Sequence, residues 1–450
     1  MNSSLISYIA RLLKSQRIRS LLADSWKMGW PLIIVMFLEF LVSITDVYVA
    51  GKIGRETQAA VGFTAQLYFV FIVLANALTM GTVAVMSKLH GGGKRSEFSQ
   101  TLYTVLTASC AAGILLGIFA FLISPLVISI SSIPSSIKEI ALPFVRIYLI
   151  ALPFHYLLIT TNGVLRATRR ALRSLITMTI VGAINIGLNL LFLYHTTLSY
   201  RGIAISTAAA IIIGSALNAI TVRKMICAKC RFSMDVLRRI AKIGFPSLIM
   251  QVSWQLGSLT MFFILGMLGD KSVDVMAAFT TGLRIESAIF LPAYALNMSA
   301  AALSGNLLGA KKEKDAFASG IITAALGMGV IILLSVAVIL NARNIASHLS
   351  GSPLVINECV RYLIIQMLAE PFMAVLVTLT GSLNGAGDTF GVMRIVVGGM
   401  WIIRVPLSWL LAIHFGLGPA AVWCVMDFDI IVRMTLILRR YIKKDWIIHA

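Results

Sequence analysis

The chain has 450 residues, of which 58% are hydrophobic and only 12% are charged, and its mean hydropathy is +0.91. This composition excludes an ordinary soluble domain and indicates a protein with many membrane-spanning segments. The net charge of +20 does not indicate nucleic-acid binding, because the Lys and Arg residues lie between apolar segments and not along one soluble face.

A basic amphipathic segment, residues 1–25, comes first and is typical of a helix that lies at the membrane interface. The next segment, 30–54, is apolar and long enough to cross the ~30 Å hydrocarbon core as a helix, yet it contains Glu39 and Asp46. Residues seven apart share a helical face. Since a carboxylate in hydrocarbon is costly, we expect this face to line a cavity that handles ions or substrate.

Further apolar segments of membrane-spanning length follow along the whole chain, which predicts an all-α protein with twelve spans. The additional spans are expected at 59–87, 99–130, 138–165, 172–195, 201–222, 244–268, 274–307, 316–342, 355–383, 390–415 and 417–438.

The distribution of positive charge predicts the orientation of these spans. An even number of spans places both termini on one side of the membrane. That side holds 27 of the 38 Lys and Arg residues, whereas the opposite side holds six. The positive-inside rule therefore predicts that both termini are cytoplasmic.

The two halves of the chain carry the same short motifs. GWP at 29–31 recurs as GFP at 244–246, and GVL at 163–165 has its counterpart in GSL at 381–383. Because each half has six spans, the repeats should enter the membrane in the same orientation. The expected divisions are an N-terminal segment 1–25, a first lobe 26–222, a cytoplasmic linker 223–243, a second lobe 244–441 and a tail 442–450.

Seven sequence marks together indicate a family. They are GKIG at 51–54 following Asp46, NGVLRA at 162–167, INIGLN at 184–189, RGIAIST at 201–207, GNLLGAKKEKDA at 305–316, GSLNGAGDT at 381–389 and RVPL at 404–407. With these marks in family order, the sequence resembles the multidrug and toxin extrusion (MATE) family over nearly its whole length.

The resemblance implies a two-lobed exporter with a central cleft, which is not an enzyme and uses no cofactor. Such a protein exchanges organic cations or other amphipathic drugs for H+ or Na+ by alternating access. The partners implied are small-molecule substrates and the lipid bilayer, without nucleic acid. We expect a monomer in a prokaryotic inner membrane.

The resemblance assigns cation coupling to Asp46, with Asn185 and Asn189 as its companions in a NorM-like, sodium-linked pattern of the first half. The spacing of the two asparagines agrees, because residues four apart lie on one helical face. They either coordinate an ion beside the carboxylate or join helices by hydrogen bonds. Sodium would need several oxygens, some of which Asp46, the two asparagines and Thr45 can supply, and no other metal site is expected.

The second half departs from that pattern. The sodium-linked branch carries an acid in the seventh span where this chain has Trp254, and another in the tenth span near Met373. Here Glu370 lies about one turn away from that position. It either substitutes for the missing acid or forms an ion pair with Arg361 or Arg404. Because the second-half pattern is incomplete, we favour protons over sodium.

Two further sets of charged residues lie inside spans. Glu39 is the repeat counterpart of Trp254 and either takes part in coupling or makes a polar contact. In the last span, the four-residue spacing of Asp429 and Arg433 predicts a structural ion pair.

Aromatic, Met and Gln side chains on the first spans of each half are candidates for substrate contact, since Met and aromatic groups adapt to varied apolar cations. Each one by itself is equally compatible with packing or lipid contact. They are Phe37, Phe40, Gln66, Phe69, Gln251, Trp254, Gln255, Met261 and Phe262.

Two other functions remain open at this point. A flippase for lipids or lipid-linked saccharides belongs to the same superfamily, although such proteins often have more spans. A passive channel would not need acids on a repeated core. A membrane enzyme is not indicated, because the sequence has no HExxH or comparable cluster.

Overall fold

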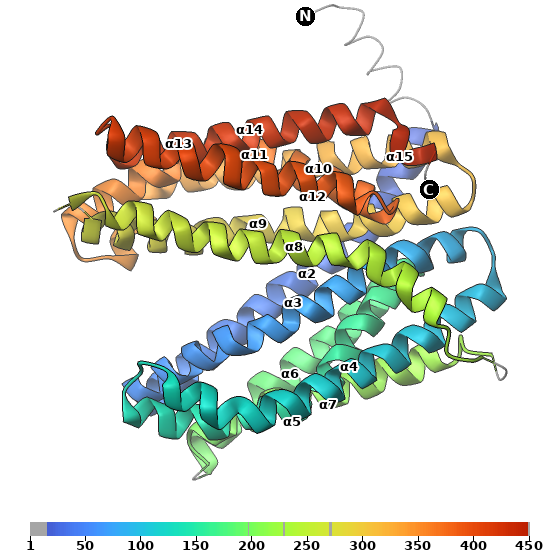
Figure 1. The fold of residues 1–450 in the computed structure, drawn as a ribbon, viewed down its shortest axis with the longest axis horizontal. Helices are drawn as coiled ribbons and strands as arrows, with labels where there is room; N and C mark the ends of the chain where they lie inside the picture. The colour runs from blue at the N-terminus through green and yellow to red at the C-terminus, as the bar shows by residue number, and fades with distance from the viewer. Residues whose placement is uncertain (1–15, 197, 228–229, 270–271, 449–450) are drawn as a thin grey trace, which may run out of the picture. The chain divides into compact units, whose positions relative to one another are not determined.

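The structure, a computed structural model, describes residues 16–196, 198–227, 230–269 and 272–448. These residues form long helices joined by short connections (Figure 1). The helices are α2 (Gln16–Ile53), α3 (Arg55–Gly91), α4 (Arg95–Ile130), α5 (Ser135–Ala167), α6 (Ala171–His195), α7 (Tyr200–Arg223), α8 (Met234–Gly266), α9 (Ser272–Gly309), α10 (Glu313–Leu349), α11 (Pro353–Gly385), α12 (Thr389–Gly398), η2 (Gly399–Arg404), α13 (Val405–Trp409), η3 (Leu410–His414), α14 (Pro419–Lys443) and α15 (Asp445–Ile448).

The predicted all-helical class with twelve spans is confirmed. Within the described residues, eleven segments are long and apolar enough to cross a membrane, and one of them joins α12 to η3 as a continuous span with two π-helical stretches. The twelfth span, α14, is of similar length but carries charged residues at its centre. Of the predicted interfacial segment, residues 1–15 lie outside the described residues, and residues 16–25 form the first turns of α2.

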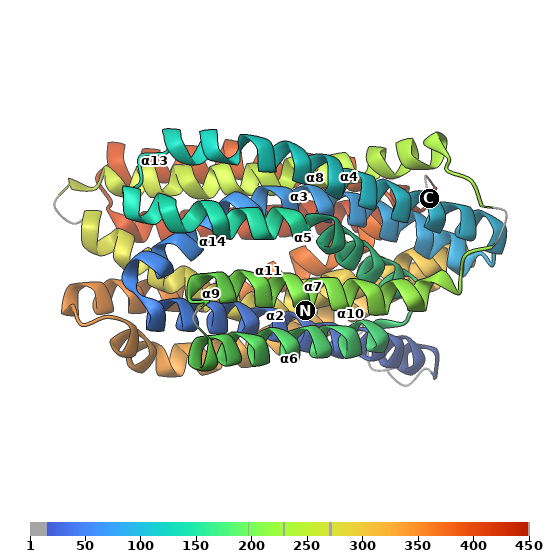
Figure 2. The ribbon, with the colours of Figure 1, turned by 90° about the horizontal axis from the view of Figure 1, so that it is seen from below.

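The chain divides into two compact units, one of residues 34–248 and one of residues 1–33 with 249–450. In the first unit α3, α4 and α7 pack against α5, and α6 packs against α7 (Figure 2). In the second unit α9, α10 and α14 pack against α11 in the same way, and η2 packs against α14. The two units therefore repeat one helix arrangement, as the recurring motifs predicted.

The division between the units falls inside α2 and α8, shortly after Pro31 and Pro246. The first turns of α2 pack within the second unit, where Thr323 of α10 donates a hydrogen bond to Ser25 at 2.9 Å. Prolines inside a helix remove a backbone hydrogen bond, so these positions are points where the helices can bend.

Glycines of the repeated motifs allow close helix contact within each unit. A Cβ atom on Gly244 would collide with the Ala77 carbonyl oxygen, and one on Gly381 would collide with the Asn297 carbonyl oxygen. In membranes, small residues at helix contacts permit close backbone approach, which provides the packing energy that the hydrophobic effect does not supply there. The motifs are thus explained by packing.

Replacing Gly244 with alanine should destabilise the protein, because the added methyl group meets backbone that cannot move freely. Overpacking of this kind costs about 1–3 kcal/mol. Gly329→Ala on α10 is the matched control, since in the described part of the chain nothing lies within 4 Å of its Cβ position. Thermal unfolding in detergent should give a lower Tm for Gly244→Ala than for the control. Equal Tm values would contradict the proposed contact.

Candidate functional site

Asp46 lies on α2 beside the two predicted asparagines of α6, and all three belong to the first unit. The side-chain amide of Asn189 donates a hydrogen bond to Asp46 Oδ1 at 2.6 Å and a second to Asn185 Oδ1 at 3.0 Å. Both asparagines are 1% exposed, whereas Asp46 is half-buried. The structure therefore brings together the three residues that the sequence selected.

Helix α7 completes this network with two hydroxyl groups. Ser206 donates a hydrogen bond to Asn189 Oδ1 at 2.6 Å, and Asn185 donates one to Thr207 Oγ1 at 2.9 Å. Both amide hydrogens and the oxygen of Asn189 are therefore engaged. These hydrogen bonds fix the orientation of the Asn189 side-chain amide, including the N–H group that it donates to the Asp46 carboxylate.

Sequence reasoning missed three members of this site. Thr207 and Ser206 lie in the RGIAIST motif, which the sequence marked only as a family feature. Tyr148 of α5 lies close to both Asp46 and Thr207. The signal for the hydroxyl residues was present in that motif, but nothing near Tyr148 in the sequence indicated its position.

The arrangement offers two ways to hold a cation. The Asp46 carboxylate can take a proton by itself, or it can contribute to a set of oxygens that includes the side chains of Asn185, Asn189 and Thr207. Among the described residues no group of three or more His, Cys, Asp or Glu side chains has the geometry of a metal site. The Thr45 hydroxyl group donates a hydrogen bond to the Leu41 carbonyl oxygen at 2.9 Å, so its hydrogen atom is already bonded within α2.

Glu39 lies on an exposed part of α2, away from this network. Its carboxylate is within electrostatic range of Arg166 on α5, in the same unit. In the part of the chain that the structure describes, no hydrogen bond joins Glu39 to Asp46 or to the asparagines. The two acids of the opening span therefore have different surroundings.

The predicted substrate residues fall into three groups by exposure. Met261 is 2% exposed and lies in the apolar core of the second unit, and Phe262 packs edge-on against Phe279 with ring centroids 5.0 Å apart. Phe40 and Gln251 are half-buried. The exposed side chains are Phe37, Gln66 and Phe69 in the first unit, and Trp254 and Gln255 in the second.

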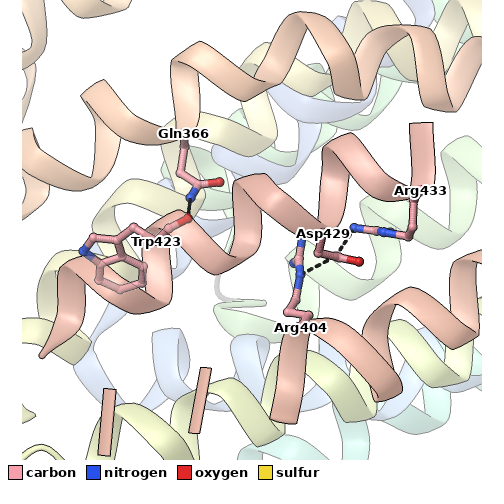
Figure 3. A network of polar contacts seen from close by, with 5 residues as sticks. All are labelled: Gln366, Arg404, Trp423, Asp429 and Arg433. Carbon is pink, nitrogen blue, oxygen red and sulfur yellow. Dashed lines mark hydrogen bonds and ion pairs between the residues drawn. The ribbon is translucent and has the colours of Figure 1, made fainter. Parts of the chain in front are cut away.

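The second unit contains a buried charged network centred on Asp429. Its Oδ2 atom accepts a hydrogen bond from Arg404 Nε at 2.8 Å and another from Arg433 at 2.6 Å (Figure 3). The predicted Asp429–Arg433 ion pair is confirmed. Arg404 comes from the π-helical stretch η2, and its guanidinium lies over the Trp254 ring at 5.4 Å.

Glu370 on α11 does not form either ion pair that the sequence allowed. Arg361 instead lies 3.3 Å from Glu358, and Arg404 pairs with Asp429. That alternative is wrong because η2 directs Arg404 toward α14. Glu370 is 1% exposed, and its Oε2 atom has no hydrogen-bond partner among the described residues.

Three carboxylates gather within electrostatic range of Arg404. They are Glu370 of α11, Glu286 of α9 and Asp427 of α14. Glu286 accepts a hydrogen bond from the Tyr362 hydroxyl group. The sequence did not predict this grouping, because its members come from separate helices and no spacing along the chain relates them.

A membrane protein built from two six-span repeats, with a carboxylate site inside the spans of one repeat, belongs to the class of two-lobed transporters. The MatE family model matches residues 31–194 and 246–410, which are more than half of the chain. The chain is a member of the MATE family. Members of this family are transporters, so the chain is a transporter and not an enzyme.

Known proteins resemble the chain over nearly its whole length. It is 22% identical to the uncharacterized transporter YisQ of Bacillus subtilis, with 94% of each chain covered. It is 21% identical to a probable multidrug resistance protein NorM of Thermotoga maritima, with 93% of this chain and 92% of the relative covered. A crystal structure of a mutant MATE transporter VcmN of Vibrio cholerae has a TM-score of 0.89 at 20% identity, covering 96% of this chain and 100% of that one.

Asp429→Asn should destabilise the second unit strongly, because it leaves two buried guanidinium groups without their carboxylate. Breaking a buried ion pair in this way costs about 3–5 kcal/mol. Asp235→Asn is the control, since the Asp235 side chain is 89% exposed and 3.7 Å from Arg238. In detergent, Tm should fall markedly for Asp429→Asn alone. A wild-type Tm for both variants would show that the network does not hold the unit together.

Proposed function

We propose that the protein is a secondary active efflux transporter that exchanges organic cations or other amphipathic drugs for a cation by alternating access. The observation that carries this proposal is the Asp46 carboxylate, which is held by Asn189 inside a membrane-spanning unit. A carboxylate at this depth is costly unless it binds and releases a positive charge. The drug-resistance names of the NorM and MdtK relatives support the same substrate class.

We favour the proton as the coupling ion. The seventh-span position where sodium-linked relatives carry an acid is occupied here by Trp254, whose ring instead contacts the guanidinium of Arg404. Arg404 supplies a fixed positive charge near that position, which disfavours a sodium ion beside it. Protonation of Asp46 requires no additional ligand.

The second unit offers a secondary candidate for proton binding. Four acids lie near Arg404: Glu370 and Asp429 are buried, whereas Glu286 and Asp427 are half-buried. They outnumber Arg404 and Arg433, so full ionisation would leave an excess of negative charge in the membrane. Such an excess is unfavourable in a medium of low dielectric constant. Glu370 is the member that we propose for coupling, because it is 1% exposed, its Oε2 atom has no hydrogen-bond partner in the described residues, and Arg404 pairs with Asp429 instead.

We also propose that both termini are cytoplasmic, since the positive charges gather on that side of the predicted spans. No feature of the described residues specifically favours a flippase or a passive channel. Those functions remain as outcomes of the transport measurements below.

Asp46→Asn should abolish gradient-driven efflux. Purified protein in vesicles would be given a proton or a sodium gradient, and the movement of a cationic dye would be followed. Wild type should respond to the proton gradient, and Asp46→Asn should fall to the level of protein-free vesicles because asparagine cannot be protonated or balance a cation.

The control for this experiment is Asp235→Asn, which also removes one carboxylate but from an exposed site. It should transport like wild type. Full transport by Asp46→Asn would remove this residue from the mechanism. Failure of either gradient to move the dye through wild-type protein would refute antiport, and a response to sodium alone would identify the coupling ion as Na+.

Asn189→Asp should change the ion dependence of transport. The new carboxylate would lie next to Asp46 in place of an amide donor at 2.6 Å, and two adjacent carboxylates share protons or attract a metal cation as a pair. The pH dependence and the sodium dependence of dye efflux would be measured. Asn341→Asp is the control, because Asn341 is exposed on α10. An unchanged ion dependence in Asn189→Asp would exclude this residue from the site.

A further inference from the structure

A groove lies in the second unit between the span that begins with α12 and the neighbouring helix α14, which run side by side (Figure 1). Its volume is about 530 Å³, within the range of small-molecule binding sites. None of the residues singled out for coupling or substrate contact lines it. The lining residues are Gly391, Arg394, Ile395, Gly398, Gly399, Ile402, Ile403, Arg433, Leu436 and Arg440.

Three of the lining residues are glycines, which carry no side chain and so leave space along one wall of the groove. Gly398 has open space at its Cβ position, where the nearest atom is Ile402 Cδ1 at 3.9 Å. The opposite wall is formed by α14, where Leu436 is 40% exposed. Ile402 at the far end is 76% exposed. The groove therefore presents an apolar channel at the surface of the helix pair.

Positive charge is concentrated along this groove. Three arginines line it, and the lining residues include no acid. Arg440 is held by Asp388 through two hydrogen bonds of 2.6 and 2.7 Å, and Arg433 is held by Asp429. Arg394 is different: it is exposed, its guanidinium lies over the Phe390 ring at 4.9 Å, and no carboxylate in the described residues is within 4 Å of it.

The depth of these residues follows from helix geometry. Arg394 lies five residues after the start of α12 and Arg440 three residues before the end of α14, which places both within about 8 Å of the helix ends at 1.5 Å per residue. Arg433 lies ten residues from the end of α14, about 15 Å deep. The groove thus runs from near the helix ends, where lipid headgroups are expected, toward the middle of α14.

We propose that this groove binds one anionic phospholipid, with its phosphate at Arg394 and an acyl chain along Ile395, Gly398 and Leu436. An arginine at the edge of the membrane needs an anionic partner, and lipid phosphates are the anions available at that depth. The apolar channel continues inward from this charge, as a single acyl chain does. An organic cation does not fit the same site, because the guanidinium group of Arg394, unpaired among the described residues, repels it.

The test uses purified full-length protein in detergent with an equimolar mixture of phosphatidylglycerol and phosphatidylcholine. Native mass spectrometry counts the lipids that stay bound. Wild type should retain phosphatidylglycerol preferentially. Arg394→Gln should reduce the fraction carrying phosphatidylglycerol by about fivefold, the effect of losing one interfacial basic contact. Gly398→Leu should reduce it as well, because its side chain fills the groove.

Two matched controls separate this site from general attraction of lipid to a basic protein. Arg439→Gln removes a neighbouring exposed arginine outside the groove, and Gly329→Leu adds the same side chain on an exposed face of α10. Both should retain lipid like wild type. Thermal unfolding of all four variants checks that each is folded, and Arg394→Gln, which changes an exposed side chain, keeps the test decisive if Gly398→Leu unfolds.

Several results would overturn the proposal. Equal retention of the two lipids by wild type would exclude headgroup recognition. Equal loss in Arg394→Gln and Arg439→Gln would indicate unspecific charge attraction, and undiminished binding by folded Gly398→Leu would place the lipid elsewhere. Displacement of phosphatidylglycerol by a cationic dye would identify the groove as a drug site instead.

Discussion

The lack of water in the bilayer core is the constraint on which this structure depends, because each polar group there must find its partner within the protein or in a ligand. In the first unit the constraint is met by an amide and hydroxyl network. Asn189 uses both amide hydrogens and its oxygen, and the residues that satisfy it come from α2, α6 and α7. These bonds hold the carboxylate of Asp46 in one place, and no Lys, Arg or His among the described residues forms an ion pair with it.

The second unit meets the same constraint with charges. Asp429 lies between two arginines from different segments, and further acids lie near Arg404. Removing any member exposes an uncompensated charge to a medium of low dielectric constant. The repeated backbone thus carries two kinds of polar interior, one of neutral groups around an acid and one of paired ions.

What the repeats share is backbone packing. Gly244 and Gly381 each approach a carbonyl group of a neighbouring helix, and both belong to motifs that recur between the halves. Close approach of helices depends on small side chains wherever the lipid is as apolar as the protein interior. The packing motifs could therefore persist while the polar residues around them diverged.

The sequence by itself determined the helical class, the twelve spans, the repeat, the grouping of Asp46 with the two asparagines and the Asp429–Arg433 pair. These features follow from segment length, local spacing and family motifs. Only the tertiary structure placed Tyr148 beside Asp46 and paired Arg361 and Arg404 with acids other than Glu370. Such contacts depend on how each helix is rotated about its axis, and hydropathy indicates that rotation poorly when both lipid and protein core are apolar.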